Sequence, residues 1–138
     1  VAPLLMYIAW PRGVAWAGIA ITDWLRIVGV GAGMLACALF WWANAAMNHA
    51  YHSGEVDLVT TGPYRWVRHP MYAAFFLVSL SFLLAAANLC IGLMWIGVNA
   101  VAILPNLRAE ERHLEQQFGE AYRRYAERTG ALWPRLIP

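Results

Sequence analysis

Three long runs of apolar residues constrain this chain more than any other feature of its sequence. Residues 27–47 contain no charged side chain, and residues 71–87 and 89–104 form two shorter runs that are separated only by Asn88. A helix needs about 20 apolar residues to cross the hydrocarbon core of a bilayer, within a range of about 17–25. The first run therefore predicts a membrane-spanning helix, and the other two predict a helical hairpin that turns at Asn88.

The composition agrees with a membrane protein and argues against a soluble domain. Of the 138 residues, 61% are hydrophobic and 13% are charged, whereas soluble domains carry about 25% charged residues. A soluble domain of this size still exposes about a third of the surface of its unfolded chain, so it cannot hide this much apolar surface. Residues 3–21 are also apolar but are interrupted at Pro11, which favours a kinked span or part of a hairpin. We therefore expect an all-α integral membrane bundle of about four spans.

Most charged residues lie in two segments outside the apolar runs, the loop 48–70 and the tail 105–138. The predicted hairpin returns the chain to the side it left, so both segments lie on one side of the membrane. They contain Arg65, Arg68, Arg108, Arg112, Arg123, Arg124, Arg128 and Arg135. Because basic residues concentrate in cytoplasmic loops, we expect loop and tail to face the cytoplasm, in a bacterial cytoplasmic membrane. The net charge of only +2, with arginines mixed among acids, argues against a nucleic-acid partner.

The loop contains the densest group of polar and aromatic residues. Pro70 suits the first turn of the helix that follows, and it favours an extended conformation at His69. Arg68 and His69 then stand at the positive end of a helix dipole, beside backbone donors that have no helical partner. Such a place can hold a carboxylate or a phosphate. The simpler alternative is a juxtamembrane anchor that contacts phospholipid headgroups.

The tail predicts an amphipathic C-terminal helix over residues 106–128. One face at helical spacing carries Leu107, Leu114, Phe118, Ala121, Tyr122 and Tyr125. Glu110 and Glu111 fall on this same face, where carboxylates are costly unless a cation meets them. The simpler alternative is that Arg108 or Arg112 pairs with them along the helix.

Two other patterns suggest sites that we do not expect. The glycines of residues 28–33 imitate a nucleotide-binding loop but lack the strand and the βαβ unit that such a loop requires. Gly29 and Gly33 instead predict a small-residue step for close packing of helices in a membrane. His49 and His52 could share a metal ion, but no third ligand of the right type is near them in sequence, so we predict no metal site.

Loop and tail together resemble a known family. Residues 58–72, LVTTGPYRWVRHPMY, resemble the signature loop of the isoprenylcysteine carboxyl methyltransferase family. The tail, with EERHL at residues 110–114 and FGEAY at residues 118–122, is similar to the closing segment of that family. The resemblance covers about residues 48–138. Phospholipid N-methyltransferases and certain sterol reductases share weaker versions of the same blocks.

The resemblance implies a membrane-embedded methyltransferase that uses S-adenosylmethionine. It implies one domain over residues 1–138, in which residues 48–72 and 105–138 form the cofactor site at the cytosolic face. Matching the motif position by position places cofactor contacts at Leu58, Val59, Tyr64, His69, Pro70, Tyr72 and Glu110. We add His52 as the polar residue that precedes the loop, and Arg68 as a partner for the cofactor carboxylate.

Two residues are candidates for catalytic roles. The family places an arginine near the acceptor, a few residues before the glutamate pair. This chain has Asn106 at the nearest equivalent spacing and Arg108 two residues later, so we assign the acceptor role to Arg108. An amine acceptor must lose a proton, for which Glu111 or His69 is a candidate base. A carboxylate or thiolate acceptor needs no base.

The expected function is methyl transfer to a lipophilic or membrane-partitioning acceptor, which carries a carboxylate, an amine or a thiol. The expected partners are this acceptor and the membrane lipid, and the oligomeric state is open. Two alternatives come from other classes. One is a nicotinamide-dependent membrane reductase related to the sterol reductases. The other is a non-enzymatic helical membrane subunit that its arginine and aromatic residues merely anchor.

Overall fold

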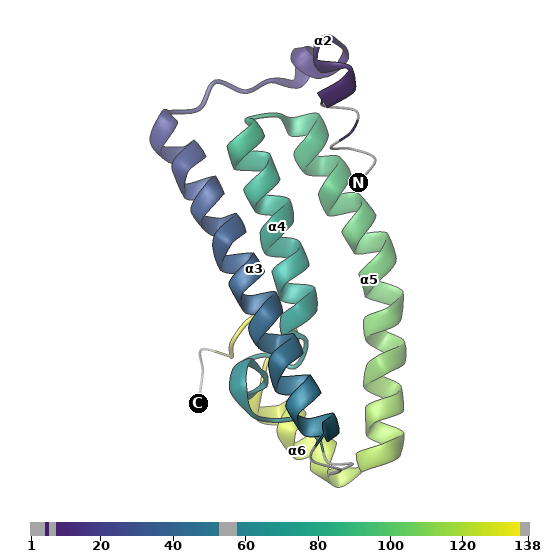
Figure 1. Ribbon diagram of the computed structural model, residues 1–138. Coiled ribbons are helices and arrows are strands. Elements are labelled where there is room, and N and C mark those ends of the chain that lie inside the picture. The colour runs from purple at the N-terminus through teal and green to yellow at the C-terminus, as the bar shows by residue number, and fades with distance from the viewer. Residues whose placement is uncertain (1–4, 6–7, 53–57, 136–138) are drawn as a thin grey trace. The chain divides into compact units, whose positions relative to one another are not determined.

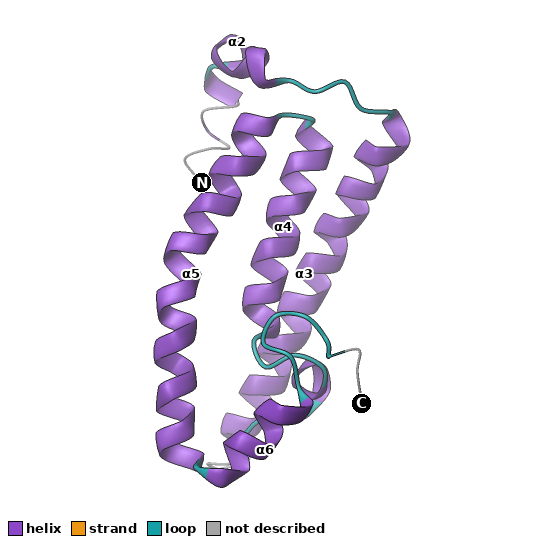
Figure 2. Ribbon diagram, turned by 180° about the vertical axis from the view of Figure 1, so that it is seen from behind, coloured by secondary structure: helices purple, strands orange, loops and turns teal. Residues whose placement is uncertain are grey.

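The computed structural model of the chain describes residue 5 and residues 8–52 and 58–135. Its elements are helix α2 (Pro11–Val14), the 3-10 turn η1 (Ala15–Ala17), helix α3 (Asp23–His52), the 3-10 turn η2 (Gly62–Arg65), and helices α4 (Pro70–Ala86), α5 (Leu89–Phe118) and α6 (Glu120–Arg128) (Figure 1). Within the described residues there are two isolated β-bridges and no strand (Figure 2). The all-α prediction is therefore confirmed.

The chain divides into two compact units. The first contains residues 1–36 and 75–102, and the second contains residues 37–74 and 103–138. Every residue that the sequence assigned to the cofactor or the acceptor lies in the second unit, which is built from the second half of α3, the start of α4, the end of α5, and α6.

Close contact between helices defines the first unit. A Cβ atom at Gly29 would lie 2.7 Å from the backbone nitrogen of Ala85, and a Cβ atom at Gly33 would lie 2.6 Å from Oγ of Ser81. These two glycines let α3 approach α4, which is the packing role that their spacing predicts. Between α4 and α5, the side-chain amide of Asn99 donates a hydrogen bond to Oγ of Ser79 at 2.9 Å.

The turn between α4 and α5 lies where the sequence places it. Ala87 has a positive φ of 49°, which ends α4. The side-chain oxygen of Asn88 then accepts a hydrogen bond from the backbone N–H of Ile91 at 3.2 Å. A side chain that accepts from an N–H three residues on satisfies one of the free donors of a helix start. A single polar residue thus both interrupts the apolar run and caps the second helix.

Helices α3 and α5 are long and apolar enough to cross a membrane. Only 11% of the most apolar stretch of α3 and 22% of that of α5 are buried within the protein. The side chain of Met34, for example, is 71% exposed and that of Val101 is 78% exposed. An apolar helix that serves as a soluble core would be mostly covered, so these exposed surfaces indicate an integral membrane protein.

The fourth span is not confirmed. The described part of residues 3–21 is helical at Leu5, Ile8 and Ala9, in the four residues of α2 and in the single turn η1, and no helix follows until Asp23. Pro11 lacks a backbone N–H and therefore starts a new helix here instead of continuing an earlier one. Helix α4 has 17 residues, most of them apolar, and this length is the lower limit for a span.

The single tail helix predicted over residues 106–128 differs from the structure in where it starts and in its continuity. Helix α5 continues without interruption through Pro105 to Phe118, so no separate helix begins at Asn106. The chain then breaks at Gly119, whose φ of 53° is a conformation that favours glycine, and α6 follows. Burial follows most of the predicted face, including the buried Tyr122, but Ala121 is exposed.

Candidate functional site

In the second unit, residues 58–69, which we call the connector, lie against the segment that follows α6. Val67 and Gly130 form a parallel β-bridge. The backbone N–H of Arg68 donates to the carbonyl of Gly130 at 2.8 Å, and the N–H of His69 donates to the carbonyl of Ala131 at 3.0 Å. The backbone N–H groups of these two residues therefore bind the chain's own C-terminal segment.

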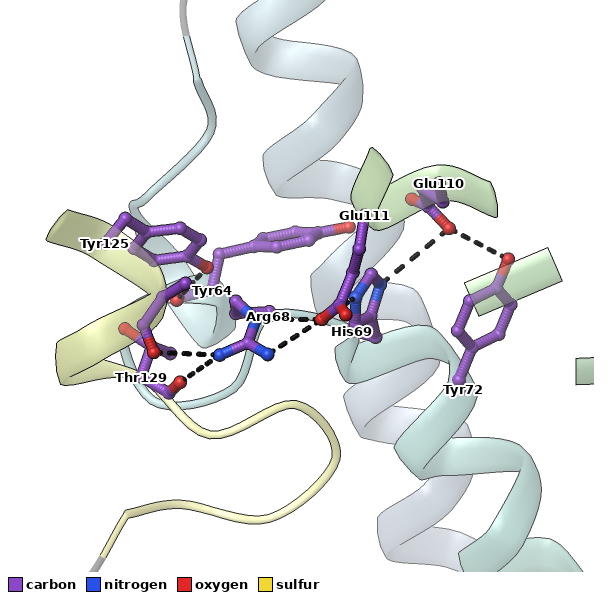
Figure 3. Close-up of polar contacts among 9 residues, drawn as sticks. Tyr64, Arg68, His69, Tyr72, Glu110, Glu111, Tyr125 and Thr129 are labelled. Carbon is purple, nitrogen blue, oxygen red and sulfur yellow. Dashed lines mark hydrogen bonds and ion pairs between the residues drawn. The ribbon is translucent and has the colours of Figure 1, made fainter. Parts of the chain in front are cut away.

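Arg68 is the centre of the contacts between these segments (Figure 3). Its Nε and Nη2 donate to Oε1 of Glu111 at 3.1 and 2.7 Å. Its Nη1 donates to the carbonyl of Ala126 at 2.9 Å and to that of Thr129 at 2.6 Å. One guanidinium group thus joins the connector to α5 and to the end of α6, and its planar set of donors suits this role better than a lysine ammonium would.

His69 lies on the other side of Glu111 in Figure 3 and is 2% exposed at its side chain. Its Nε2 is 3.3 Å from Oε1 of Glu111, and its Nδ1 is 3.7 Å from Oε2 of Glu110. The imidazole also stacks on the ring of Tyr72, with centroids 5.6 Å apart. The Tyr72 hydroxyl donates to Oε2 of Glu110 at 2.9 Å. Arg68, His69, Tyr72, Glu110 and Glu111 therefore form one connected polar network.

The negative charge of the Glu111 carboxylate is stabilised by its neighbours Arg68 and His69. This carboxyl lies seven residues beyond Leu104, the last residue of the apolar run, and we place it outside the membrane. Burial alone would raise its pKa, but the hydrogen bond and the charge of Arg68, followed by those of His69, lower the pKa below its ordinary value. Glu111 is therefore ionised at neutral pH and is a weak base.

Two tyrosines of α6, Tyr122 and Tyr125, lie close to residues of the network or of η2. Burial, and then the charge of Glu111, raise the pKa of Tyr122 to about 12. The hydroxyl of Tyr125 donates to the backbone carbonyl of Tyr64 at 2.6 Å, and burial raises the pKa of Tyr125 as well. Both hydroxyls stay protonated at neutral pH, and the second one attaches η2 to α6.

A cavity of about 330 Å³ lies beside the network. It is lined by Arg68, Arg108, Glu111, Arg112, Glu115, Tyr122 and Ala126. The lining offers three guanidinium groups and two carboxylates, a donor set that suits a ligand carrying both an anionic and a cationic group. The cavity is at the lower end of the range of about 300–1,000 Å³ that is typical of small-molecule sites.

The structure unites some predicted site residues and separates others. It joins five of them in the network, and it places Arg108 on the same cavity as Arg68 and Glu111. Pro70 is buried at the start of α4, and Leu58 and Val59 are half-buried ahead of η2. His52 is exposed at the end of α3, where its Nδ1 contacts the carbonyl of Asn48 at 2.8 Å. No contact within the described residues joins His52 to the network.

The cation that meets Glu111 is not one of the two that the sequence offered as the simpler alternative. Arg108 and Arg112 are neighbours on the same helix, yet the partner is Arg68, which lies 43 residues away in sequence. Sequence reasoning also gave Tyr122 no site role, although the residue lies on the same predicted helix face as Glu111. That shared face was the available signal.

A known protein family matches the region of the chain that contains the network. The model of the isoprenylcysteine carboxyl methyltransferase (ICMT) family matches residues 24–116, two thirds of the chain. This range includes all five residues of the network and ends before Gly119.

Three relatives align with most of the chain. The nickel-cobalt-cadmium resistance protein of Alcaligenes xylosoxydans xylosoxydans is 35% identical over 124 residues, which are 87% of this chain and 52% of that protein. The cobalt-zinc-cadmium resistance protein of Cupriavidus metallidurans is 31% identical, over 88% of this chain and 54% of that protein. The protein-S-isoprenylcysteine O-methyltransferase of Homo sapiens is 28% identical, over 86% of this chain and 44% of that protein. The chain thus spans about half the length of these relatives.

Proposed function

The chain belongs to the isoprenylcysteine carboxyl methyltransferase family, and we propose that it transfers a methyl group from S-adenosylmethionine to an acceptor at a membrane. Two names among its relatives refer to metal resistance and describe those proteins. The proposal for this chain rests on the family and on the network of Arg68, His69, Tyr72, Glu110 and Glu111.

The single observation that carries the proposal is the pairing of Glu111 with Arg68. Two separate sequence blocks carry the family's motif, and this ion pair joins one block to the other at 2.7 Å. A merely anchoring loop would give no reason for a carboxylate on the inner face of α5. We propose that residues 48–72 and 105–138 form one cofactor site within a single domain.

The residues around the cavity fit the cofactor. S-adenosylmethionine carries a carboxylate, an ammonium group and a sulfonium group. Arg112 presents a guanidinium group to the cavity that suits a carboxylate, and Glu111 and Glu115 present carboxylates that suit a cation. Tyr122 adds an aromatic face and a protonated hydroxyl. These residues are proposed to hold the cofactor, together with Glu110 on the other side of His69.

When bound, the cofactor supplies a methyl group on a positively charged sulfur. The contribution of the protein is then to orient the acceptor in line with the methyl–sulfur bond and to exclude water. Orientation of this kind can lower a barrier by about 7–11 kcal/mol in favourable cases. We propose that Arg108 orients the acceptor, because it reaches the same cavity as Glu111 without an ion pair to it among the described residues.

The protonation state of Glu111 favours one class of acceptor. A carboxylate with a lowered pKa that accepts two hydrogen bonds from Arg68 is a poor general base. An acceptor that arrives as an anion, a carboxylate or a thiolate, needs no such base. We therefore propose an anionic acceptor on a lipophilic carrier, with Glu111 positioning Arg68 and His69. We also propose that the site faces the cytoplasm from a bacterial cytoplasmic membrane, and the arginines of loop and tail support this orientation.

Ligand binding to the purified full chain tests the proposal. We expect S-adenosylhomocysteine to raise the thermal unfolding temperature and NADPH to leave it unchanged, because a ligand that binds only the folded state stabilises it. Stabilisation by NADPH alone would support the reductase, and stabilisation by neither ligand would support the non-enzymatic subunit.

A matched pair of variants locates the site. We expect Glu110→Gln to weaken binding of S-adenosylhomocysteine by about tenfold, the size of a lost hydrogen bond to a charged group. Glu127→Gln, an exposed position of α6 away from the network, should leave the affinity unchanged. Glu115 is unsuitable as this control because it lines the cavity. Equal effects at positions 110 and 127 would contradict the assigned site.

A further inference from the structure

The second unit contains another groove, on a different face of α6 from Tyr122. It has a volume of about 480 Å³ and is lined by Thr60, Arg65, Ala121, Arg124, Tyr125, Arg128 and Thr129. Arg65 comes from η2, whereas Arg124 and Arg128 are four residues apart on α6 and therefore share one face of that helix. We call these three residues the arginine groove.

The charge of the arginine groove is unbalanced. All three arginines are exposed, and the described residues of the lining include no carboxylate. Among the described residues, no carboxylate oxygen lies within 4.0 Å of any of the three guanidinium groups. Like charges four residues apart destabilise a helix, so Arg124 and Arg128 repel each other in the absence of an anion.

The neighbouring arginine of α6 shows the contrast. Arg123 donates to Oε1 of Glu115 at 2.8 Å and to Oε1 of Glu120 at 2.9 Å. The carboxylates of Glu115 and Glu120 are therefore paired with Arg123 and not with the arginine groove. The cavity beside the network likewise has two carboxylates among its lining residues.

The groove also has fixed walls and further donors. The hydroxyl of Tyr125 donates a hydrogen bond to the backbone carbonyl of Tyr64, which attaches η2 to α6 and so holds Arg65 and Arg128 on one groove. Thr60 and Thr129 add hydroxyl groups to the lining. Guanidinium groups bind phosphate oxygens through paired hydrogen bonds, and several such groups around one cavity suit a doubly charged anion.

Exposed tryptophans of the second unit support a location of the groove near a membrane surface. The guanidinium carbon of Arg65 lies 5.3 Å from the centre of the Trp66 ring. The Trp66 side chain is 48% exposed and that of Trp133 is 66% exposed. Exposed tryptophans are typical of the boundary between lipid and water.

We propose that the arginine groove binds the phosphate group of an anionic ligand, either the headgroup of a phospholipid or a soluble phosphate. The lining residues that the structure describes offer no carboxylate to an ammonium group and share no member with the cavity proposed for the cofactor, so we treat the two sites as separate. The inference does not depend on methyl transfer.

Calorimetric titration of the full chain in an uncharged maltoside detergent tests the proposal. The three probes are short-chain phosphatidic acid, short-chain phosphatidylcholine and inorganic phosphate. Binding of phosphatidic acid much tighter than that of inorganic phosphate identifies a lipid headgroup, and equal binding of the two identifies a soluble phosphate. Phosphatidylcholine should bind weakly, because its quaternary ammonium cancels the charge. Binding of neither phosphatidic acid nor inorganic phosphate overturns the proposal.

Variants of α6 decide whether the groove is the site. Replacing Arg124 and Arg128 together by glutamine should weaken phosphatidic acid binding by about tenfold or more. Arg123→Gln is the matched control, since it removes one charge from the same helix and should change the affinity by less than about twofold. Should the double variant fail to fold by circular dichroism, Arg65→Gln on η2 applies the same test. An equal loss in the control overturns the proposal.

Competition separates the two sites. Saturating S-adenosylhomocysteine should leave the affinity for phosphatidic acid unchanged, because the lining residues of the two cavities do not overlap. Displacement of the lipid would show that it occupies the cofactor site, and the arginine groove would then have no ligand of its own.

Discussion

Removal of the Arg68 side chain should release the C-terminal segment from the connector. In Arg68→Ala, the carbonyls of Ala126 and Thr129 lose their donor, and Glu111 loses the cation that accounts for its lowered pKa. The backbone hydrogen bonds from residues 68 and 69 to the segment after α6 remain available but are no longer supported by the side chain.

The size of the effect follows from the contacts of Arg68. Hydrogen bonds to charged groups contribute about 1.5–3 kcal/mol each, and breaking a buried ion pair costs about 3–5 kcal/mol. The side chains of Arg68 and Glu111 are 15% and 29% exposed, so water screens part of this interaction. We expect Arg68→Ala to lower the free energy of local opening by about 2–4 kcal/mol.

Hydrogen–deuterium exchange measures this opening directly. The amides of Arg68 and His69 are bonded to the carbonyls of Gly130 and Ala131 and exchange only when the C-terminal segment leaves. Their exchange in Arg68→Ala should be about 30-fold to 1,000-fold faster, since about 1.4 kcal/mol corresponds to a factor of ten.

The control for this experiment is Arg123→Ala, which removes an exposed arginine of α6 and should leave exchange in the connector unchanged. The double variant that lacks both Arg68 and Glu111 should open less easily than the two single effects predict together, because each single variant leaves a charge without its partner. Exchange no faster in Arg68→Ala than in the control would refute the view that this arginine holds the segment.

Three further predictions concern other parts of the chain. The pKa of Glu111 is lowered in the folded state, so its stabilising effect is complete above its ordinary pKa of 4.5 and is lost as the pH falls through the lowered value; unfolding temperatures between pH 7 and 3 should show this loss, and Glu111→Gln should reduce it. Gly29→Ala should destabilise the protein by about 1–3 kcal/mol, because the new Cβ meets α4, whereas Gly31→Ala, with no atom within 4 Å, should stabilise it by about 0.5–1 kcal/mol in the same thermal unfolding assay. Asn88→Ala should cost about 1 kcal/mol through loss of the α5 cap, again measured by unfolding; a neutral result would show that the turn is held by its other contacts.

The helical hairpin was predictable because its signals are local. Apolar runs, the proline at the start of α4 and the polar Asn88 at the turn all act on their immediate neighbours in sequence. The step at Gly29 and Gly33 was predictable for a similar reason, since a spacing of four places both residues on one face of a helix.

The partner of Glu111 was not predictable, because helical spacing shows only which residues of the same helix are neighbours. That rule offered Arg108 and Arg112, while the actual partner reaches Glu111 from another segment. The wrong prediction that a separate helix begins after Pro105 has a related cause. Proline removes one helical hydrogen bond and usually ends a helix, and the sequence does not show that the rest of the helix tolerates the loss.

The break at Gly119 explains how the short helix α6 contributes lining residues to two cavities of different charge. A continuous helix would have carried residues 120–128 onward along the axis of α5, whereas the positive φ of Gly119 starts a new helix. On α6, Tyr122 and Ala126 are one turn apart and line the cavity that contains carboxylates. Arg124 and Arg128 are one turn apart on another face and line the groove, whose described residues include no carboxylate. Because Arg68 binds the carbonyls at the end of this helix, its side chain fixes the position of both faces at once.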